Sequence, residues 1–138
     1  MEKMEELNHL NRFQEISAEP TITELLWSDP EPDSSGFRMS PRGAGFLFGE
    51  DTVQKFTREN EIKFVVRAHQ LVREGPKEMF GGKLITVWSA PNYCYRCGNI
   101  ASILEMDEGF EKEFKDFEAN TSEKKFRVEK REVGEYFL

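Results

Sequence analysis

Long apolar runs, cysteines and excess positive charge are all scarce in this sequence of 138 residues. No apolar run approaches the roughly 18 residues that a membrane-spanning helix needs, so we expect no membrane segment. Two cysteines cannot form a disulfide framework, which favours a cytoplasmic or nuclear protein. The formal net charge of −7 argues against nucleic-acid binding, because that binding depends on contacts between basic side chains and phosphates.

The residues that are present suit one domain with a modest core. Hydrophobic residues make up 38% of the chain, and phenylalanine, which suits a buried core, is the most frequent aromatic. The acidic balance does not exclude an anionic substrate, because a few well-placed arginines decide the local potential.

The first half of the sequence predicts two helices separated by a loop. Apolar residues recur at helical spacing in 2–14, which indicates an amphipathic helix. Residues 28–45 are rich in Pro, Gly, Ser and Asp and predict a long irregular loop. A second helix is expected to be capped by Asp51 or Thr52 and to run to Asn60.

Three short apolar runs in the second half predict strands: FVV at 64–66, LITVW at 84–88 and ASIL at 101–104. The last two are expected to be neighbouring antiparallel strands joined by a long loop. After residue 105 the sequence is strongly charged, and from about 119 we expect a tail that becomes ordered only against a partner. The chain therefore divides into a domain at 1–118 and a charged tail at 119–138.

Both cysteines lie in the connector SAPNYCYRCGN, where Cys94 and Cys97 form a C-x-x-C. A structural zinc site needs four ligands, and the only histidines, His9 and His69, stand alone, which argues against zinc. A redox pair is typically found at a helix N-terminus, whereas this pair lies between two predicted strands, which argues against redox chemistry.

Two polar residues invite a functional interpretation. Arg42 lies between a proline and a glycine, so its guanidinium can stand clear of the backbone and bind an oxyanion. His69 follows a predicted strand, where a neutral imidazole can bind a metal ion. Taken singly, each residue has a plain structural alternative: an exposed arginine and a histidine satisfied within the fold.

Five segments together are more specific than any one of them: LLWSDP at 25–30, PRGAGFLFG at 41–49, RAHQLV at 67–72, SAPNYCYRCGN at 89–99 and the terminal YFL. As a set they resemble the metal-dependent serine/threonine protein phosphatases. The resemblance is strongest to the type 2A-like catalytic subunits, which include types 2A, 4 and 6. It extends over nearly the whole chain.

The resemblance implies an α/β fold, namely the C-terminal half of the metallophosphoesterase β-sandwich flanked by helices. It also implies two divalent metal ions, manganese or iron with zinc. A metal-activated hydroxide would attack the phosphorus of phosphoserine or phosphothreonine in protein substrates. Regulatory or scaffold subunits would bind through the C-terminal tail.

The resemblance assigns roles to individual residues. His69 would bind one of the metal ions, Arg42 would hold phosphate oxygens, and Tyr93 would line the catalytic cleft. Asp29 would lie close to the active centre and support the residues that form it. The terminal Leu138 matches a leucine whose carboxylate is methylated in type 2A-like enzymes.

The connector SAPNYCYRCGN resembles the family's mobile loop over the active site, which takes part in inhibitor binding. The residues expected to lie near an inhibitor are Cys94, Tyr95, Arg96 and Cys97.

The family motifs GDxHG, GDxVDRG and GNHE do not occur in this sequence, although they carry most of the metal ligands. We therefore expect the chain to be the C-terminal part of a phosphatase and to be inactive alone. The alternative is a non-catalytic module that binds phosphatase regulatory subunits through the tail at 119–138. We favour the first, because a pure binding module has no need of Arg42, His69 and Tyr93.

Overall fold

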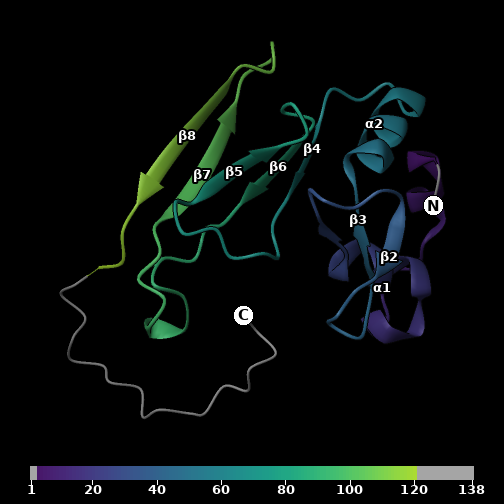
Figure 1. The fold of residues 1–138 in the computed structure, drawn as a ribbon, viewed down its shortest axis with the longest axis horizontal. Coiled ribbons are helices and arrows are strands. Elements are labelled where there is room, and N and C mark those ends of the chain that lie inside the picture. The colour runs from purple at the N-terminus through teal and green to yellow at the C-terminus, as the bar shows by residue number, and fades with distance from the viewer. Residues whose placement is uncertain (1–2, 121–138) are drawn as a thin grey trace. The chain divides into compact units, whose positions relative to one another are not determined.

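The computed structural model describes residues 3–120, which divide into two compact units (Figure 1). The first unit comprises the chain up to His69 together with Glu78–Ile85, and the second comprises Gln70–Lys77 together with the chain from Thr86 onward. The helices between residues 3 and 120 are all too short or too polar to cross a membrane.

The first unit begins with two 3₁₀ helices, η1 (Met4–His9) and η2 (Ile16–Ala18), followed by the α-helix α1 (Pro20–Trp27). The prediction of one amphipathic helix over 2–14 was therefore wrong. No residue of η1 is buried, and Phe13 is 99% exposed. The apolar stripe has no core to pack against, and a short helix depends on such packing for most of its stability.

A three-stranded sheet follows, with the strand order β1-β3-β2. Strand β1 (Asp29–Pro30) runs parallel to β3 (Phe46–Phe48), and β2 (Phe37–Met39) runs antiparallel to β3. The loop predicted for 28–45 thus contains two short strands. Its composition hid them, because a two- or three-residue strand is defined by its pairing partner rather than by its own periodicity.

Helix α2 (Glu50–Glu59) confirms the second predicted helix, although its N-cap is Gly49 rather than Asp51 or Thr52. The helix buries Val53 in a small core with Met79 and Leu84, against which Phe48 and Phe80 also pack.

A second three-stranded sheet has the order β4-β6-β5. Strands β4 (Val65–Arg67) and β6 (Leu84–Val87) confirm the strands predicted at 64–66 and 84–88, whereas β5 (Pro76–Met79) was not predicted. The first three residues of β6 are almost fully buried, as their apolar run requires.

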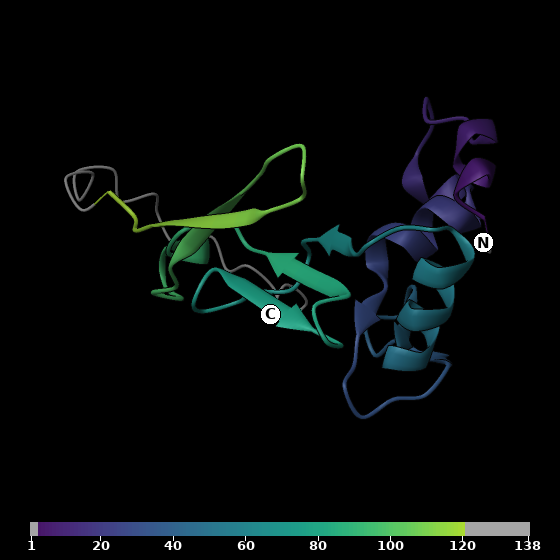
Figure 2. The same cartoon turned by 90° about the horizontal axis from the view of Figure 1, so that it is seen from above.

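The second unit contains the hairpin of β7 (Ala101–Met106) and β8 (Lys112–Phe117), drawn in green to yellow in Figure 1 and Figure 2. Strand β7 confirms the strand predicted at 101–104. Its predicted pairing with the strand at 84–88 was wrong, because β7 pairs with β8 and β6 belongs to another sheet. Strand β8 was missed because its charged residues alternate with only two phenylalanines.

Candidate functional site

The candidate site of the first unit is built around the carboxylate of Asp29, which begins strand β1 directly after the end of α1. Asp29 is only 2% exposed. Its Oδ2 accepts a hydrogen bond from Nε of Arg42 at 2.6 Å, and its Oδ1 accepts one from Nη2 of Arg67 at 2.7 Å. A buried carboxylate is stable only when it is paired, and here each oxygen faces its own cation.

A tight turn places Arg42 next to this carboxylate. The Arg42 amide donates to the hydroxyl of Ser40 at 3.2 Å, and Gly43 and Gly45 have φ angles of 79° and 68°. A Cβ atom on Gly45 would lie 2.7 Å from the carbonyl carbon of Trp27, so only glycine allows the turn to approach the end of α1. The backbone conformation of the PRGAG turn thus fixes the position of Arg42.

Arg67 on β4 is a site residue that the sequence analysis missed. Its Nη2 also donates to the carbonyl oxygen of Ser28 at 3.1 Å, so it binds two neighbouring residues of the same segment. Burial lowers the pKa of Arg67 and the Asp29 carboxylate opposes that shift, but a guanidinium keeps its charge in either case. The available signal was an arginine ending an apolar strand, since a buried cation requires an anionic partner.

His69 lies two residues after Arg67, with a φ of 77° that is uncommon for a residue with a side chain. Its ring packs edge-on against Trp27, with 5.4 Å between the ring centroids. Burial lowers the pKa of His69, while Asp29 acts in the opposite direction, so the neutral imidazole is favoured at neutral pH. Its Nε2 is buried and has no hydrogen-bond partner among residues 3–120.

A neutral imidazole with an unused, buried nitrogen suits a metal ligand, so His69 fits the divalent metals that the resemblance implies. The described part of the chain contains no group of three His, Cys, Asp or Glu side chains that could hold a metal ion. His69 would accordingly be one ligand in a larger set.

The arrangement is suited to binding an oxyanion. Two guanidinium groups face one carboxylate, which leaves a positive charge at the site. Arg42 uses Nε for the ion pair, and within residues 3–120 its two Nη groups make no hydrogen bond. Parallel N–H groups of this kind match the geometry of phosphate oxygens.

Tyr93, the fourth predicted site residue, belongs to the second unit. Its ring packs edge-on against Trp88, with 4.8 Å between the ring centroids. It begins a 3₁₀ turn, η3 (Tyr93–Tyr95), in the connector predicted to take part in inhibitor binding. The structure therefore brings together Asp29, Arg42 and His69 in the first unit and describes Tyr93 by itself in the second.

The connector around Tyr93 is organised by two asparagines. The side-chain oxygen of Asn99 accepts from the Tyr93 amide at 2.7 Å, and the Asn92 side chain accepts from the Gly98 amide at 3.0 Å. Asn92 itself has a φ of 45°. Sequence reasoning missed this role, although Asn is a frequent residue in such turns. The thiols of Cys94 and Cys97 are free and half-buried.

Leu138, the residue predicted to be methylated, lies outside the described residues, as does nearly all of the predicted tail at 119–138.

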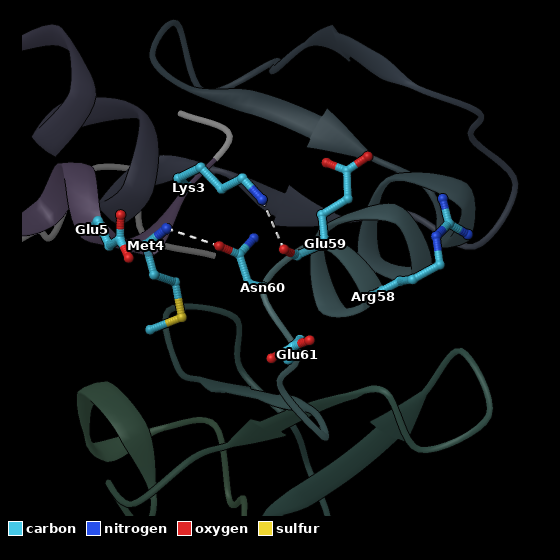
Figure 3. Close-up of a pocket in the computed structure, with 7 residues that line it drawn as sticks. All are labelled: Lys3, Met4, Glu5, Arg58, Glu59, Asn60 and Glu61. Carbon is cyan, nitrogen blue, oxygen red and sulfur yellow. Dashed lines mark hydrogen bonds between the residues drawn. The ribbon is translucent and has the colours of Figure 1, made fainter.

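A separate pocket in the first unit lies where η1 meets the end of α2 (Figure 3). Lys3 Nζ donates to the carbonyl oxygen of Glu59, and the Met4 amide donates to Oδ1 of Asn60, both at 2.9 Å. These contacts satisfy polar groups at the C-terminus of α2. None of the predicted site residues lines this pocket.

Comparison with known proteins agrees with this geometry. The model of the calcineurin-like phosphoesterase family matches residues 1–73, more than half of the chain, and this range contains Asp29, Arg42, Arg67 and His69. A solved structure of a protein serine/threonine phosphatase from Saccharomyces cerevisiae, described as similar to human phosphatase PP5, superposes with a TM-score of 0.74 at 30% identity. The match covers 86% of this chain and 40% of that one.

This agreement extends to the fold, a mixed α/β arrangement of small sheets and helices that corresponds to part of a metallophosphoesterase. The family implies divalent metal ions. With more than half of its residues matched by the family model, the chain belongs to the calcineurin-like phosphoesterase family.

Proposed function

We propose that this chain is part of a metal-dependent protein serine/threonine phosphatase. The observation that carries the proposal is the cluster of Arg42, Asp29 and Arg67 close in sequence to His69, whose Nε2 has no hydrogen-bond partner among residues 3–120. The Nη groups of Arg42 can bind a phosphate, and the histidine offers a ligand to a metal ion. The match to a solved serine/threonine phosphatase supports this choice of substrate class.

Each candidate site residue has a defined role in the proposed reaction. The Nη groups of Arg42 bind oxygens of the phosphoryl group and stabilise the charge that develops there. Asp29 orients Arg42 through its Oδ2, and Arg67 pairs with the other oxygen of Asp29. His69 binds one of two divalent ions, manganese or iron with zinc, which when bound supply Lewis acidity and an activated water. Tyr93 lines the cleft.

The finer assignment follows from the sequence motifs. We propose a type 2A-like enzyme whose remaining metal ligands come from a segment outside these 138 residues. Phosphoproteins would be its substrates, and regulatory or scaffold subunits would bind the tail at 119–138, whose Leu138 would be methylated. A cytoplasmic or nuclear location agrees with the two unpaired cysteines.

The test is an assay of the native protein, isolated from its source by an antibody against the tail. We expect manganese-dependent hydrolysis of a phosphothreonine peptide and loss of that activity in the His69→Ala variant. The isolated 138-residue chain should show no activity, because residues 3–120 lack a complete set of metal ligands. Manganese-dependent hydrolysis by the isolated chain that His69→Ala abolishes would contradict this.

The intact mass of the same native protein decides between the two functions. A mass well above 16.1 kDa, together with activity, supports the phosphatase. A mass of 16.1 kDa without activity supports the alternative, a non-catalytic module that binds regulatory subunits through its tail.

A further inference from the structure

The carboxylate of Asp29 accepts one hydrogen bond from each of two arginines, and the two arginines use different nitrogen atoms. Arg42 reaches Oδ2 through Nε alone, and Arg67 reaches Oδ1 through Nη2. When a carboxylate faces a single arginine, it commonly accepts two parallel N–H groups from it as a two-pronged pair. Here Arg67 donates to the oxygen that Arg42 would need for such a pair, and Arg42 makes no bond to it.

We propose that Arg67 is a positioning residue that occupies Oδ1 of Asp29 and thereby leaves both Nη groups of Arg42 available to an oxyanion. This inference rests on the proposed function, in which the oxyanion is the phosphoryl group of the substrate. Without Arg67, Oδ1 becomes available to Arg42. The resulting pair, made through Nε and one Nη, withdraws that Nη from the phosphate.

Two hydrogen bonds fix the position of the Arg67 guanidinium. Its Nη2 also binds the carbonyl oxygen of Ser28 at 3.1 Å, which anchors the guanidinium independently of the carboxylate. Its side chain is 14% exposed, compared with 21% for Arg42. The backbone of Asp29 is fixed as well, because β1 pairs with β3 at Leu47. The least constrained member of the cluster is thus the guanidinium of Arg42.

A simple electrostatic role for Arg67 makes a different prediction. Loss of its positive charge would weaken anion binding but would leave the pairing of Arg42 with Asp29 unchanged. A positioning role changes that pairing even when no anion is present. The two explanations therefore differ in a spectroscopic property of Arg42 itself.

The experiment uses arginine-selective NMR on the native protein without added anion, with the Arg42 signals assigned by their loss in Arg42→Lys. In the wild type, we expect the Nη groups of Arg42 to exchange by rotation about the Nε–Cζ bond. In Arg67→Met, the two-pronged pair should hinder that rotation and give separate Nη signals. Arg67→Lys, whose ammonium can still occupy Oδ1, should keep the wild-type pattern, as should the surface control Arg58→Met.

A titration with inorganic phosphate gives the second measurement. We expect Arg67→Met to bind phosphate about tenfold more weakly than the wild type, because one charge-assisted N–H group is lost. Arg58→Met should bind as the wild type does. Identical Arg42 signals in Arg67→Met and the wild type would overturn the proposal, whatever the affinity.

The wild type alone provides a further check in case Arg67→Met does not fold. Phosphate should shift the Nη signals of Arg42 and leave those of Arg67 in place, and a direct response of Arg67 would overturn its role as a positioning residue. If phosphate shifts neither arginine, the proposed phosphate clamp is wrong, while the Arg42 signals of the Arg67 variants still decide the positioning role.

Discussion

At the scale of single residues, the site depends on a carboxylate that never needs to touch the substrate. Asp29 is almost fully buried and contacts one cation through each oxygen. Removing one member of a buried ion pair leaves an uncompensated charge, which is far more costly than losing a surface pair. The hydrogen bond from Nε to Asp29 thus orients Arg42 without occupying its Nη groups, and on the proposed function this reduces the entropy lost when a phosphate binds.

On the proposed function, we predict that Arg42→Ala in the native protein lowers kcat/KM by about 10²- to 10³-fold, because the phosphate loses a preorganised charged donor. Steady-state kinetics with a phosphothreonine peptide measures this. Arg58→Ala, which removes an exposed arginine from α2, should change kcat/KM less than about twofold. A similar rate for Arg42→Ala and the wild type would remove Arg42 from the site.

At the scale of elements, the N-terminus of α2 is joined to the loop that precedes β2. The Gly49 amide donates to the carbonyl oxygen of Gly36 at 3.2 Å, and the carboxylate of Asp51 accepts from the Ser35 hydroxyl at 2.7 Å and from the Gly36 amide. An acidic residue in the first turn also suits the helix dipole. The joint fixes the loop against the helix and holds one end of the first sheet.

We predict that Gly49→Ala destabilises the protein by about 2 kcal/mol or more, because the new Cβ would overlap the carbonyl oxygen of Ser34 and force the backbone apart. Urea denaturation followed by circular dichroism gives the change in the free energy of unfolding. The control is Gly81→Ala, where the Cβ would have open space but φ is 63°, so only about 1 kcal/mol should be lost. Equal losses at the two sites would contradict the steric argument.

Asp51 leads to a pH-dependent prediction for the same joint. The Ser35 hydroxyl and the Gly36 amide hold the pKa of Asp51 below its ordinary value of 3.8. Because the folded-state pKa is lowered, the stabilisation is fully present above 3.8 and is lost as the pH falls through the folded value. Asp51→Asn should therefore have a lower urea midpoint at pH 7, and the difference should shrink in strong acid. A difference independent of pH would contradict this account.

At the scale of the whole molecule, much apolar surface remains open to water. Helix α1 has no buried residue, and its Leu25 and Leu26 are 47% and 50% exposed. Phe13 is exposed as well. Exposed apolar side chains in such number promote association when nothing covers them. The chain spans 40% of the phosphatase structure that it matches, and we propose that further parts of the protein cover this surface.

We predict that the isolated 138-residue chain associates as its concentration rises, which light scattering would detect. Replacing Leu25 and Leu26 together by glutamine should reduce that association, because both side chains are half-exposed and their loss opens no cavity. The same pair of changes at Thr52 and Lys55 on α2 serves as the control. A wild-type chain that stays monomeric at all concentrations would contradict the prediction.

Several parts of this molecule could be predicted from local sequence. The β-branched runs predicted β4, β6 and β7, and the residues after Gly49 predicted α2. The remaining elements depend on partners distant in sequence. Strand β8 is stabilised by its pairing with β7, and the two strands inside 28–45 by their pairing with β3. The helix predicted over 2–14 failed because its apolar stripe meets no core.

The sequence by itself determined the family of the protein and singled out Arg42 and His69 as the candidate anion-binding and metal-binding residues, because short motifs fix residue type and spacing. Only the tertiary structure decided that Arg67 shares the carboxylate of Asp29 with Arg42 and that, within the described part of the chain, Nε2 of His69 has no partner. The physical reason is that burial and ion pairing join residues 13 and 38 positions apart, and no local pattern records such distances.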